Sequence, residues 1–190
     1  MTADDHPYNE TPYPVPDDEP ERLEALRRYG AFGLLQSTVF DDIARLAAFI
    51  CQTPISMVSL IDSNRQWFLA KTGFNSCETS REVSFCAHAL VGTDMLVVTD
   101  THLDARFSRN PMVTGDPFIR FYSGVPLLTS DGYALGTLCV VDYVPRTLTL
   151  EQTDALRSLS RLVMTQLEFS RLKREMRVLK QAVTLRPAPR

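Results

Sequence analysis

The chain of 190 residues has 20 Lys and Arg against 23 Asp and Glu, a formal net charge of −3, and 44% of its residues are hydrophobic. That length and apolar content suffice for one domain with a substantial core. The acidic balance argues against general nucleic-acid binding, no apolar run approaches the ~20 residues of a membrane-spanning helix, and the polar, acidic start is unlike a signal peptide. Four cysteines without a CxxC pair predict reduced thiols in a cytoplasmic protein.

The first segment, residues 1–19, combines four prolines with acidic side chains, which predicts an extended or disordered arm. A helix is expected to begin just before Pro20, because proline is tolerated in a first helical turn. A second helix follows Thr38, which forms a capping box with Asp41, and ends before Pro54. Its buried stripe is expected at Phe40, Ile43, Ala44, Ala47 and Ile50.

Two hairpins are expected on either side of a less regular region. In the first, Ile55–Asp62 reads as a strand and Gln66–Lys71 as its return strand. In the second, two apolar runs are joined through Asp131-Gly132, which suits a two-residue type I′ turn. The later run, Ala134–Val141, is almost unbroken by polar residues, so it is expected in the middle of a sheet with both faces covered.

The region between the hairpins is predicted to be an ordered cover over one sheet face, because it is long and irregular but too apolar for disorder. A short helix over residues 85–90 is capped by Ser84 or Thr79. Leu96–Asp100 is expected as a short strand. Asp104–Asn110 is expected as one helical turn, followed by loop from Pro111.

The last helix is expected to begin after Thr149, which forms a capping box with Gln152, and to continue without Gly or Pro until Pro187. One stripe of this helix is predicted to pack on the sheet: Leu156, Leu159, Val163 and Leu167. A second stripe with seven-residue spacing outlasts the domain and favours a partner helix: Leu162, Phe169, Leu172, Met176, Leu179 and Val183. The basic face of this helix is interpreted as a solvated surface, with pairing to the acidic arm or to an anionic partner as the alternative.

Five motifs occur in order at natural spacing: SLIDSNRQWF (59–68), SFCAHAL (84–90), VVTDTHLDARFSRNPMV (97–113), IRFYSGVPLLTSDGYALGTLCVVD (119–142) and PRTLTLEQ (145–152). Together they closely resemble the GAF domain, and most of all the bacterial sensory subgroup found before histidine kinases and diguanylate cyclases.

The resemblance implies an α+β fold with a central six-stranded antiparallel sheet, terminal helices on one face, and a ligand pocket under loops and short helices on the other. It implies a GAF domain over residues 20–170, followed by a coiled-coil-like extension and tail over 171–190. The helical faces of such domains commonly form homodimers. No kinase, cyclase or phosphodiesterase module follows the helix, so the domain is expected to act on a signalling partner in trans or to be a fragment of a longer sensor protein.

The candidate pocket residues come from the cover and from the strand after it: Cys86, His88, Asp100, Arg106, Phe107, Arg120, Phe121 and Tyr122. Arg120 beside aromatic rings suits an anionic or planar ligand. The alternative is a structural ion pair between Arg120 and Asp100 or Asp116.

The cysteines raise a redox alternative. Cys77 and Cys86 stand where the resemblance to free methionine-(R)-sulfoxide reductases places two of their cysteines, but residues 104–124 lack the further cysteine that such an enzyme needs. Catalysis is therefore not expected. A redox-switching disulfide between Cys77 and Cys86 stays open as an alternative. A catalytic pair of Cys86 and His88 would require a segment that is not helical, because residues two apart lie on different faces of a helix.

No cofactor is identified from the sequence. Covalent bilin is not expected, because residues 103–122 contain neither cysteine nor histidine. Haem would need His88 or His102 as axial ligand, and a lone histidine is more often structural. No ligand spacing indicates a metal.

Three functions remain. The first is a sensory domain that binds a small molecule or partner and signals through a dimeric C-terminal helix; its premise is a hollow between the sheet and residues 84–120. The second is a ligand-free dimerisation module whose pocket is filled by Phe107, Phe118 and Phe121. The third is a thiol redox protein or switch.

Overall fold

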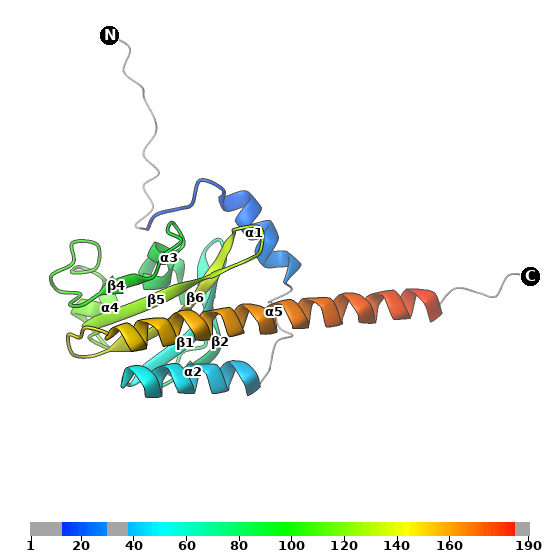
Figure 1. Ribbon diagram of the computed structural model, residues 1–190. Coiled ribbons are helices and arrows are strands. Elements are labelled where there is room, and N and C mark those ends of the chain that lie inside the picture. The colour runs from blue at the N-terminus through cyan, green and yellow to red at the C-terminus, as the bar shows by residue number, and fades with distance from the viewer. Residues whose placement is uncertain (1–12, 30–37, 185–190) are drawn as a thin grey trace, which may run out of the picture.

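The computed structural model describes residues 13–29 and 38–184 (Figure 1). Six strands form one sheet in the order β3-β2-β1-β6-β5-β4, and every neighbouring pair is antiparallel. The expected α+β fold with a six-stranded antiparallel sheet is confirmed. The strands are β1 (Ile55–Ile61), β2 (Arg65–Thr72), β3 (Glu78–Ser80), β4 (Leu96–Val98), β5 (Phe121–Leu128) and β6 (Ala134–Asp142).

Helices cover both faces of this sheet. On one face α1 (Glu19–Arg28), α2 (Thr38–Cys51) and α5 (Leu150–Thr184) share a core with the strands. On the other, α3 (Phe85–Ala89) and α4 (Pro111–Thr114) share a second core with them. The predicted ordered cover is therefore present, and it consists of two short helices joined by turns.

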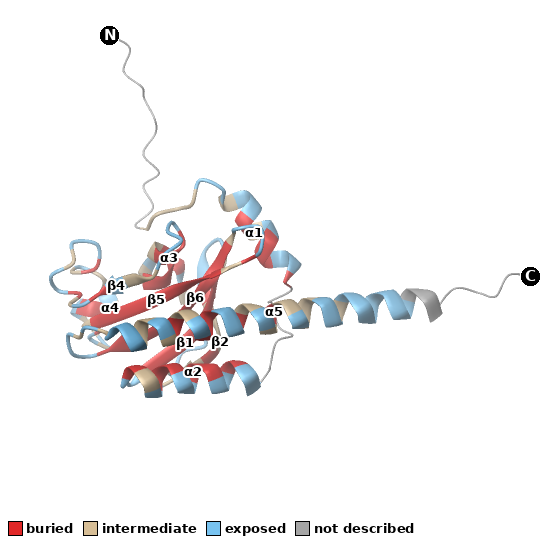
Figure 2. Ribbon diagram, viewed as in Figure 1, coloured by how far each residue is buried: buried red, intermediate tan, exposed pale blue. Residues whose placement is uncertain are grey.

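The central strands are buried on both sides, as the unbroken apolar run predicts. Every residue of β1 and β6 is buried (Figure 2). Side chains alternate between the two cores: Val58 and Leu138 face the helical layer, whereas Met57 and Cys139 face the cover. Since both faces are apolar, neither layer could be removed without exposing a core surface.

The turn between β5 and β6 is not type I′, and that expectation is wrong. The Gly132 N–H donates to the Thr129 carbonyl at 3.0 Å, and the Thr129 N–H donates to the Tyr133 carbonyl at 3.0 Å. Gly132 has a φ of 93°, whereas Asp131 is not among the described residues with positive φ. These features fit a three-residue loop with glycine in the left-handed position, because Ser130 supplies one more turn residue.

The cover differs in detail from the expectation. Ser84 caps α3, since its Oγ accepts the Ala87 N–H at 3.0 Å. Residues 104–110 form hydrogen-bonded turns, and they include a single helical turn in which the Ser108 N–H donates to the Asp104 carbonyl at 2.9 Å. The expectation of loop from Pro111 is wrong. Pro111 begins α4, because Asn110 caps this helix and proline fits its first turn. The strand β4 also ends at Val98, two residues earlier than expected.

The long helix α5 begins as predicted. The Thr149 N–H donates to Gln152 Oε1 at 3.0 Å, and the Gln152 N–H donates to Thr149 Oγ1 at 3.2 Å, which completes the capping box. The predicted sheet-facing stripe is buried: Leu156, Leu159, Val163 and Leu167. Arg171 and Arg174 still contact Tyr29 and the Arg28 carbonyl at the end of α1, and the last part of α5 projects past the rest of the domain (Figure 1). No helix within residues 13–29 or 38–184 is long and apolar enough to cross a membrane.

A buried ionic cluster of Glu19, Arg22 and Arg81 holds α1 against the end of the sheet. Arg22 and Arg81 are each 1% exposed, and the carboxylate of Glu19 lies between them. Arg22 Nε donates to Glu19 at 2.7 Å and its Nη1 donates to the Ile61 carbonyl at 2.9 Å. Arg81 Nη1 reaches Glu19 and the Asp62 carbonyl. A single carboxylate therefore balances two buried guanidinium groups.

We expect Glu19→Gln to lower the free energy of unfolding by about 3 kcal/mol at pH 7, because it leaves two buried cations without their counter-charge. Burial raises the pKa of Glu19, but the hydrogen bonds from Arg22 and Arg81 outweigh it and lower that pKa below its ordinary value. The contribution is therefore complete above the unfolded pKa near ~4.3 and is lost as pH falls through the lower folded pKa.

Urea denaturation at several pH values measures this effect. The difference between wild type and Glu19→Gln should shrink as pH falls toward 3. The matched control is Glu24→Gln in the same helix, where Glu24 and Arg27 form an exposed pair. Equal losses for both variants would contradict the role of Glu19.

Candidate functional site

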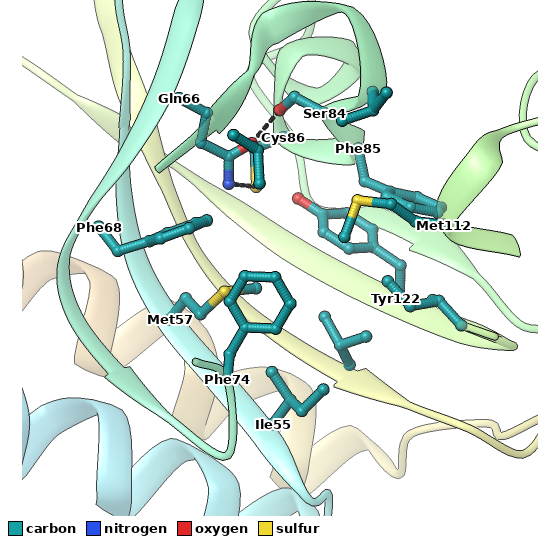
Figure 3. Close-up of a pocket in the computed structure, with 14 residues that line it drawn as sticks. Ile55, Met57, Gln66, Phe68, Phe74, Ser84, Phe85, Cys86, Met112 and Tyr122 are labelled. Carbon is teal, nitrogen blue, oxygen red and sulfur yellow. Dashed lines mark hydrogen bonds between the residues drawn. The ribbon is translucent and has the colours of Figure 1, made fainter. Parts of the chain in front are cut away.

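The space between sheet and cover is almost filled. A cavity lies among β1, β2, β5 and the start of α3, with a free volume of about 20 Å³ (Figure 3). That is room for about one water molecule. The expected hollow is closed because large side chains meet across it: Met57, Phe68, Phe74, Phe85 and Met112. This is a correction to the premise of an open pocket.

The inner end of the cavity is polar. Gln66 reaches across from β2, where its Nε2 donates to Cys86 Sγ at 3.3 Å and its Oε1 accepts the hydroxyl of Ser84 (Figure 3). Tyr122 points its hydroxyl toward the same end, where this buried oxygen lies near Cys86 and Thr137 but makes no hydrogen bond of good geometry with a described residue. A poorly bonded hydroxyl is costly when it is buried, so the site has a hydrogen-bonding group that a better partner could use.

Local sequence explains the position of Tyr122. The residue two places later on the same face of β5 is Gly124, and a Cβ there would lie 2.2 Å from the Tyr122 hydroxyl oxygen. The glycine therefore makes space for the phenol to lie along the strand. The ring also stacks on Phe85, with centroids 5.3 Å apart. The Tyr-x-Gly spacing is the sequence signal for this arrangement, and it was missed.

Two of the eight candidate pocket residues, Cys86 and Tyr122, line the cavity. Phe107 packs behind the wall, where it stacks on Phe85 with centroids 4.6 Å apart. Phe121 lies in the core beneath the helical layer, because neighbouring residues of a strand face opposite sides. Phe118 is exposed, so of the three phenylalanines expected to fill the pocket only Phe107 belongs to the cover-side core.

The candidate cations are already paired. Arg120 binds Asp100 through two contacts, of 3.1 and 2.7 Å, which is the structural ion pair that the sequence left as an alternative. Arg106 binds Asp104 in the same bidentate manner, at 2.9 and 2.6 Å. The hydrogen bonds from these arginines lower the pKa values of both carboxyl groups. Neither arginine lines the cavity.

His88 lies on α3 with its ring against the edge of Phe107, at a centroid distance of 4.6 Å. Burial, with a contribution from the charge of Arg106, lowers the pKa of His88 to about 4, so the ring is neutral at pH 7. His88 does not line the cavity, so it cannot present an axial nitrogen to a ligand there. Since Phe85–Ala89 is helical, a catalytic pair with Cys86 is ruled out on geometry.

The structure separates the two redox candidates. Cys77 is exposed, and Lys71 Nζ lies 3.5 Å from its sulfur. Cys86 is buried and contacts Cys139, with the two sulfurs 3.8 Å apart. All four cysteines are free thiols. In the part of the chain that the structure describes, no group of three His, Cys, Asp or Glu side chains is placed to hold a metal ion.

Comparison with known proteins agrees with this architecture. The GAF domain family profile matches residues 37–167, and the chain belongs to the GAF domain family. Over 159 residues it is 42% identical to a cyclic di-GMP phosphodiesterase of Pseudomonas aeruginosa. The match covers 83% of this chain but 27% of that protein, so the chain spans about a quarter of its relative's length.

Solved structures share the fold at low sequence identity. The GAF domain of a phosphoenolpyruvate-protein phosphotransferase from Coxiella burnetii superposes with a TM-score of 0.61 at 12% identity, over 80% of this chain and 94% of that chain. Free methionine-R-sulfoxide reductase from Neisseria meningitidis, solved with its substrate, superposes with a TM-score of 0.59 at 17% identity, over 85% and 96% of the two chains. These likenesses establish the fold alone.

We expect Tyr122→Phe to raise the free energy of unfolding by about 1 kcal/mol, because it removes a buried hydroxyl whose contacts with Cys86 and Thr137 lack good hydrogen-bond geometry. Chemical denaturation of the purified protein measures the change. The control is Tyr29→Phe, where the lost hydroxyl bonds to Glu168, and stability should fall by a similar amount. A loss of stability in Tyr122→Phe would mean that the hydroxyl has a partner in solution.

Proposed function

We propose that this chain is a regulatory GAF module that works as a homodimer and transmits a conformational change along α5. Its membership in the GAF family supports a sensory or regulatory role. The observation that carries the proposal is the apolar stripe on the outward face of α5. Burying such a stripe against a partner helix removes apolar surface from water and stabilises the dimer.

The stripe follows the predicted seven-residue spacing and is exposed. Leu162, Phe169 and Met176 are 54%, 59% and 58% exposed, and Leu172 and Leu179 are 46% and 65% exposed. The side chain of Val183, the last predicted member, lies outside the described residues. Phe169, Leu172 and Met176 also form the apolar floor of a shallow groove along the helix.

The neighbouring helix also has exposed apolar residues. α2 lies beside α5, and its outward residues Leu46 and Phe49 are 50% and 81% exposed (Figures 1 and 2). Two copies that meet through α2 and α5 would bury both surfaces in a four-helix bundle whose longest members continue as a coiled coil. A two-fold axis along α5 would satisfy this arrangement with one self-complementary surface.

The charges beside the stripe favour two parallel helices in register. With Leu162, Phe169 and Met176 at the a positions of the heptad, Glu168 and Glu175 occupy g positions and Lys173 and Lys180 occupy e positions. In a parallel pair each g residue meets the e residue five places further along the partner helix. Glu168 would therefore meet Lys173 of the other copy, and Glu175 would meet Lys180. The sequence thus provides opposite charges at both places.

The input to the module is proposed to be a small molecule or partner that opens the cover and offers a polar group to Tyr122. The poorly bonded Tyr122 hydroxyl supports this input, whereas the free volume of about 20 Å³ supports the alternative of a ligand-free dimerisation module. Native mass spectrometry of protein purified from its source cells separates the two. A retained small molecule supports the first, and its absence supports the second.

The output is proposed to be control of cyclic di-GMP turnover by an attached or separate effector. The 42% identity to part of a cyclic di-GMP phosphodiesterase supports this choice. The module itself is inferred to be non-catalytic, because Cys86 lacks a base and the cations near the cover are paired with carboxylates. We infer that it acts in the cytoplasm, where bacterial second messengers are made and degraded.

We expect Phe169→Asp to weaken self-association by about 100-fold or more, because it places a charge at the centre of the proposed seam. Sedimentation equilibrium measures the dissociation constant. Stability of the single domain should be nearly unchanged, since Phe169 is exposed there. The control is Val178→Asp, an equally exposed apolar residue outside the seam. A Phe169→Asp variant that dimerises like wild type would contradict the proposed role of α5.

A charge exchange tests the orientation of the helices. Lys180→Glu and Glu175→Lys should each weaken homodimers by about tenfold, because each places like charges opposite one another twice per dimer. Mixing the two variants should restore wild-type affinity, since every pair in the heterodimer then has opposite charges. Sedimentation equilibrium of the variants and of their mixture measures this. No recovery in the mixture would contradict parallel, in-register pairing.

A further inference from the structure

A pair of thiols lies at the inner end of the cavity, where the cover meets the central sheet. Cys86 is in the first turn of α3 and Cys139 is on β6, and they are 1% and 0% exposed. They are 53 residues apart in sequence, yet their sulfurs are 3.8 Å apart. Neither thiol has a role in the regulatory function described above.

We propose that Cys86 and Cys139 are a redox modification site, at which a small peroxide converts the two thiols into an intramolecular disulfide. The site differs from the pairing of Cys77 with Cys86, because it joins two residues that already touch. It also goes beyond the proposed function, since it adds a covalent input that requires no ligand.

The geometry suits bond formation. A disulfide bond is about 2.05 Å long, so each sulfur has to move by roughly 0.9 Å from the present contact. Movements of this size are within the reach of side-chain rotation together with a small shift of α3. The short helix is held to the sheet by side-chain packing, whereas Cys139 is fixed in a fully buried strand.

The surroundings distinguish the two sulfurs. Gln66 donates to Cys86 at 3.3 Å, and a hydrogen bond joins the sulfurs of Cys86 and Cys139 at 3.8 Å. Burial raises the pKa of Cys86, but the hydrogen bond with Cys139, with contributions from Ser59, Thr137 and Tyr122, outweighs it and lowers that pKa. The hydrogen bond to Cys86, together with burial, raises the pKa of Cys139. Cys86 lines the cavity and Cys139 does not, so Cys86 meets the oxidant first. Cys86 is therefore the nucleophile and Cys139 is the thiol that resolves the intermediate.

The reaction balances with hydrogen peroxide as the only oxidant. The Cys86 thiolate attacks one peroxide oxygen, the O–O bond breaks, and hydroxide leaves and takes up the thiol proton as water. Cys139 then attacks the sulfur of the sulfenic acid, the S–O bond breaks, and a second water leaves with the Cys139 proton. The two thiols lose two electrons and the peroxide gains them.

The cavity selects the oxidant by size. It reaches Cys86 and leaves room for about one water, and its wall includes Phe74 and Thr79, the latter on the edge strand β3. A peroxide requires only a small outward movement of this wall. A glutathione-sized disulfide would have to displace the cover. The exposed Cys77 is the site that bulky reagents reach first.

The test is peptide mapping of the full chain after brief exposure to hydrogen peroxide and alkylation of the remaining thiols in denaturant. We expect a peptide pair that links Cys86 to Cys139, with Cys51 alkylated. The cross-link should be unchanged in Cys77→Ser. In Cys139→Ser it should be absent, and a dimedone adduct at Cys86, formed when dimedone is added together with the denaturant, should mark the trapped sulfenic acid. Glutathione disulfide should modify Cys77 alone.

A second measurement uses the wild-type protein and therefore does not depend on whether a variant folds. The melting temperature of wild type should rise on peroxide treatment and return after addition of dithiothreitol, since the cross-link restricts the unfolded chain. A folded Cys86→Ala variant should show no such shift. The proposal is overturned if peroxide oxidises Cys77 while Cys86 and Cys139 remain fully alkylatable, or if Cys86 is linked only to Cys77.

Discussion

The structure depends on the burial of its two central strands on both faces. All residues of β1 and β6 are buried, so the sheet requires one layer on each side. The terminal helices form the first layer and the segment from α3 to α4 forms the second. Leu167 is the last apolar residue of α5 that is buried in the first layer, so the exposed apolar residues beyond it are available for another contact.

The second layer determines what the site can do. The ring of Tyr122 on β5 stacks on Phe85 in the cover, and Phe85 stacks on Phe107. Together these side chains leave space for about one water. The polar groups at the inner end therefore lie close to one another instead of surrounding an open pocket. Any input at this site, whether a ligand or an oxidant, must act through the contact between α3 and the sheet. A shift of the sheet at that contact would reach α5, which packs on the opposite face.

Sequence patterns predicted the elements whose side chains have a strong period. The stripes of α2 and α5 and the apolar run of β6 all emerged from local spacing. The errors lie where single residues decide between similar local structures, as at the turn before Gly132 and the start of α4 at Pro111. The site was harder to predict. Phe121 and Tyr122 are adjacent, and only the register of β5 determines which of them faces the cover. The contact between Cys86 and Cys139 depends on tertiary structure and leaves no local pattern.

The central claim is that the outward stripe of α5 pairs with the same stripe of a second copy, parallel and in register. Disulfide cross-linking at single introduced cysteines tests it most directly, in a Cys77→Ser background that removes the exposed native thiol. Leu172→Cys should form a disulfide-linked dimer under mild oxidation, because residues at a d position face each other across the two-fold axis. Val178→Cys should not, although Val178 is 60% exposed against 46% for Leu172, because it lies off the seam. Equal cross-linking at both positions, or none at Leu172→Cys, would contradict the account.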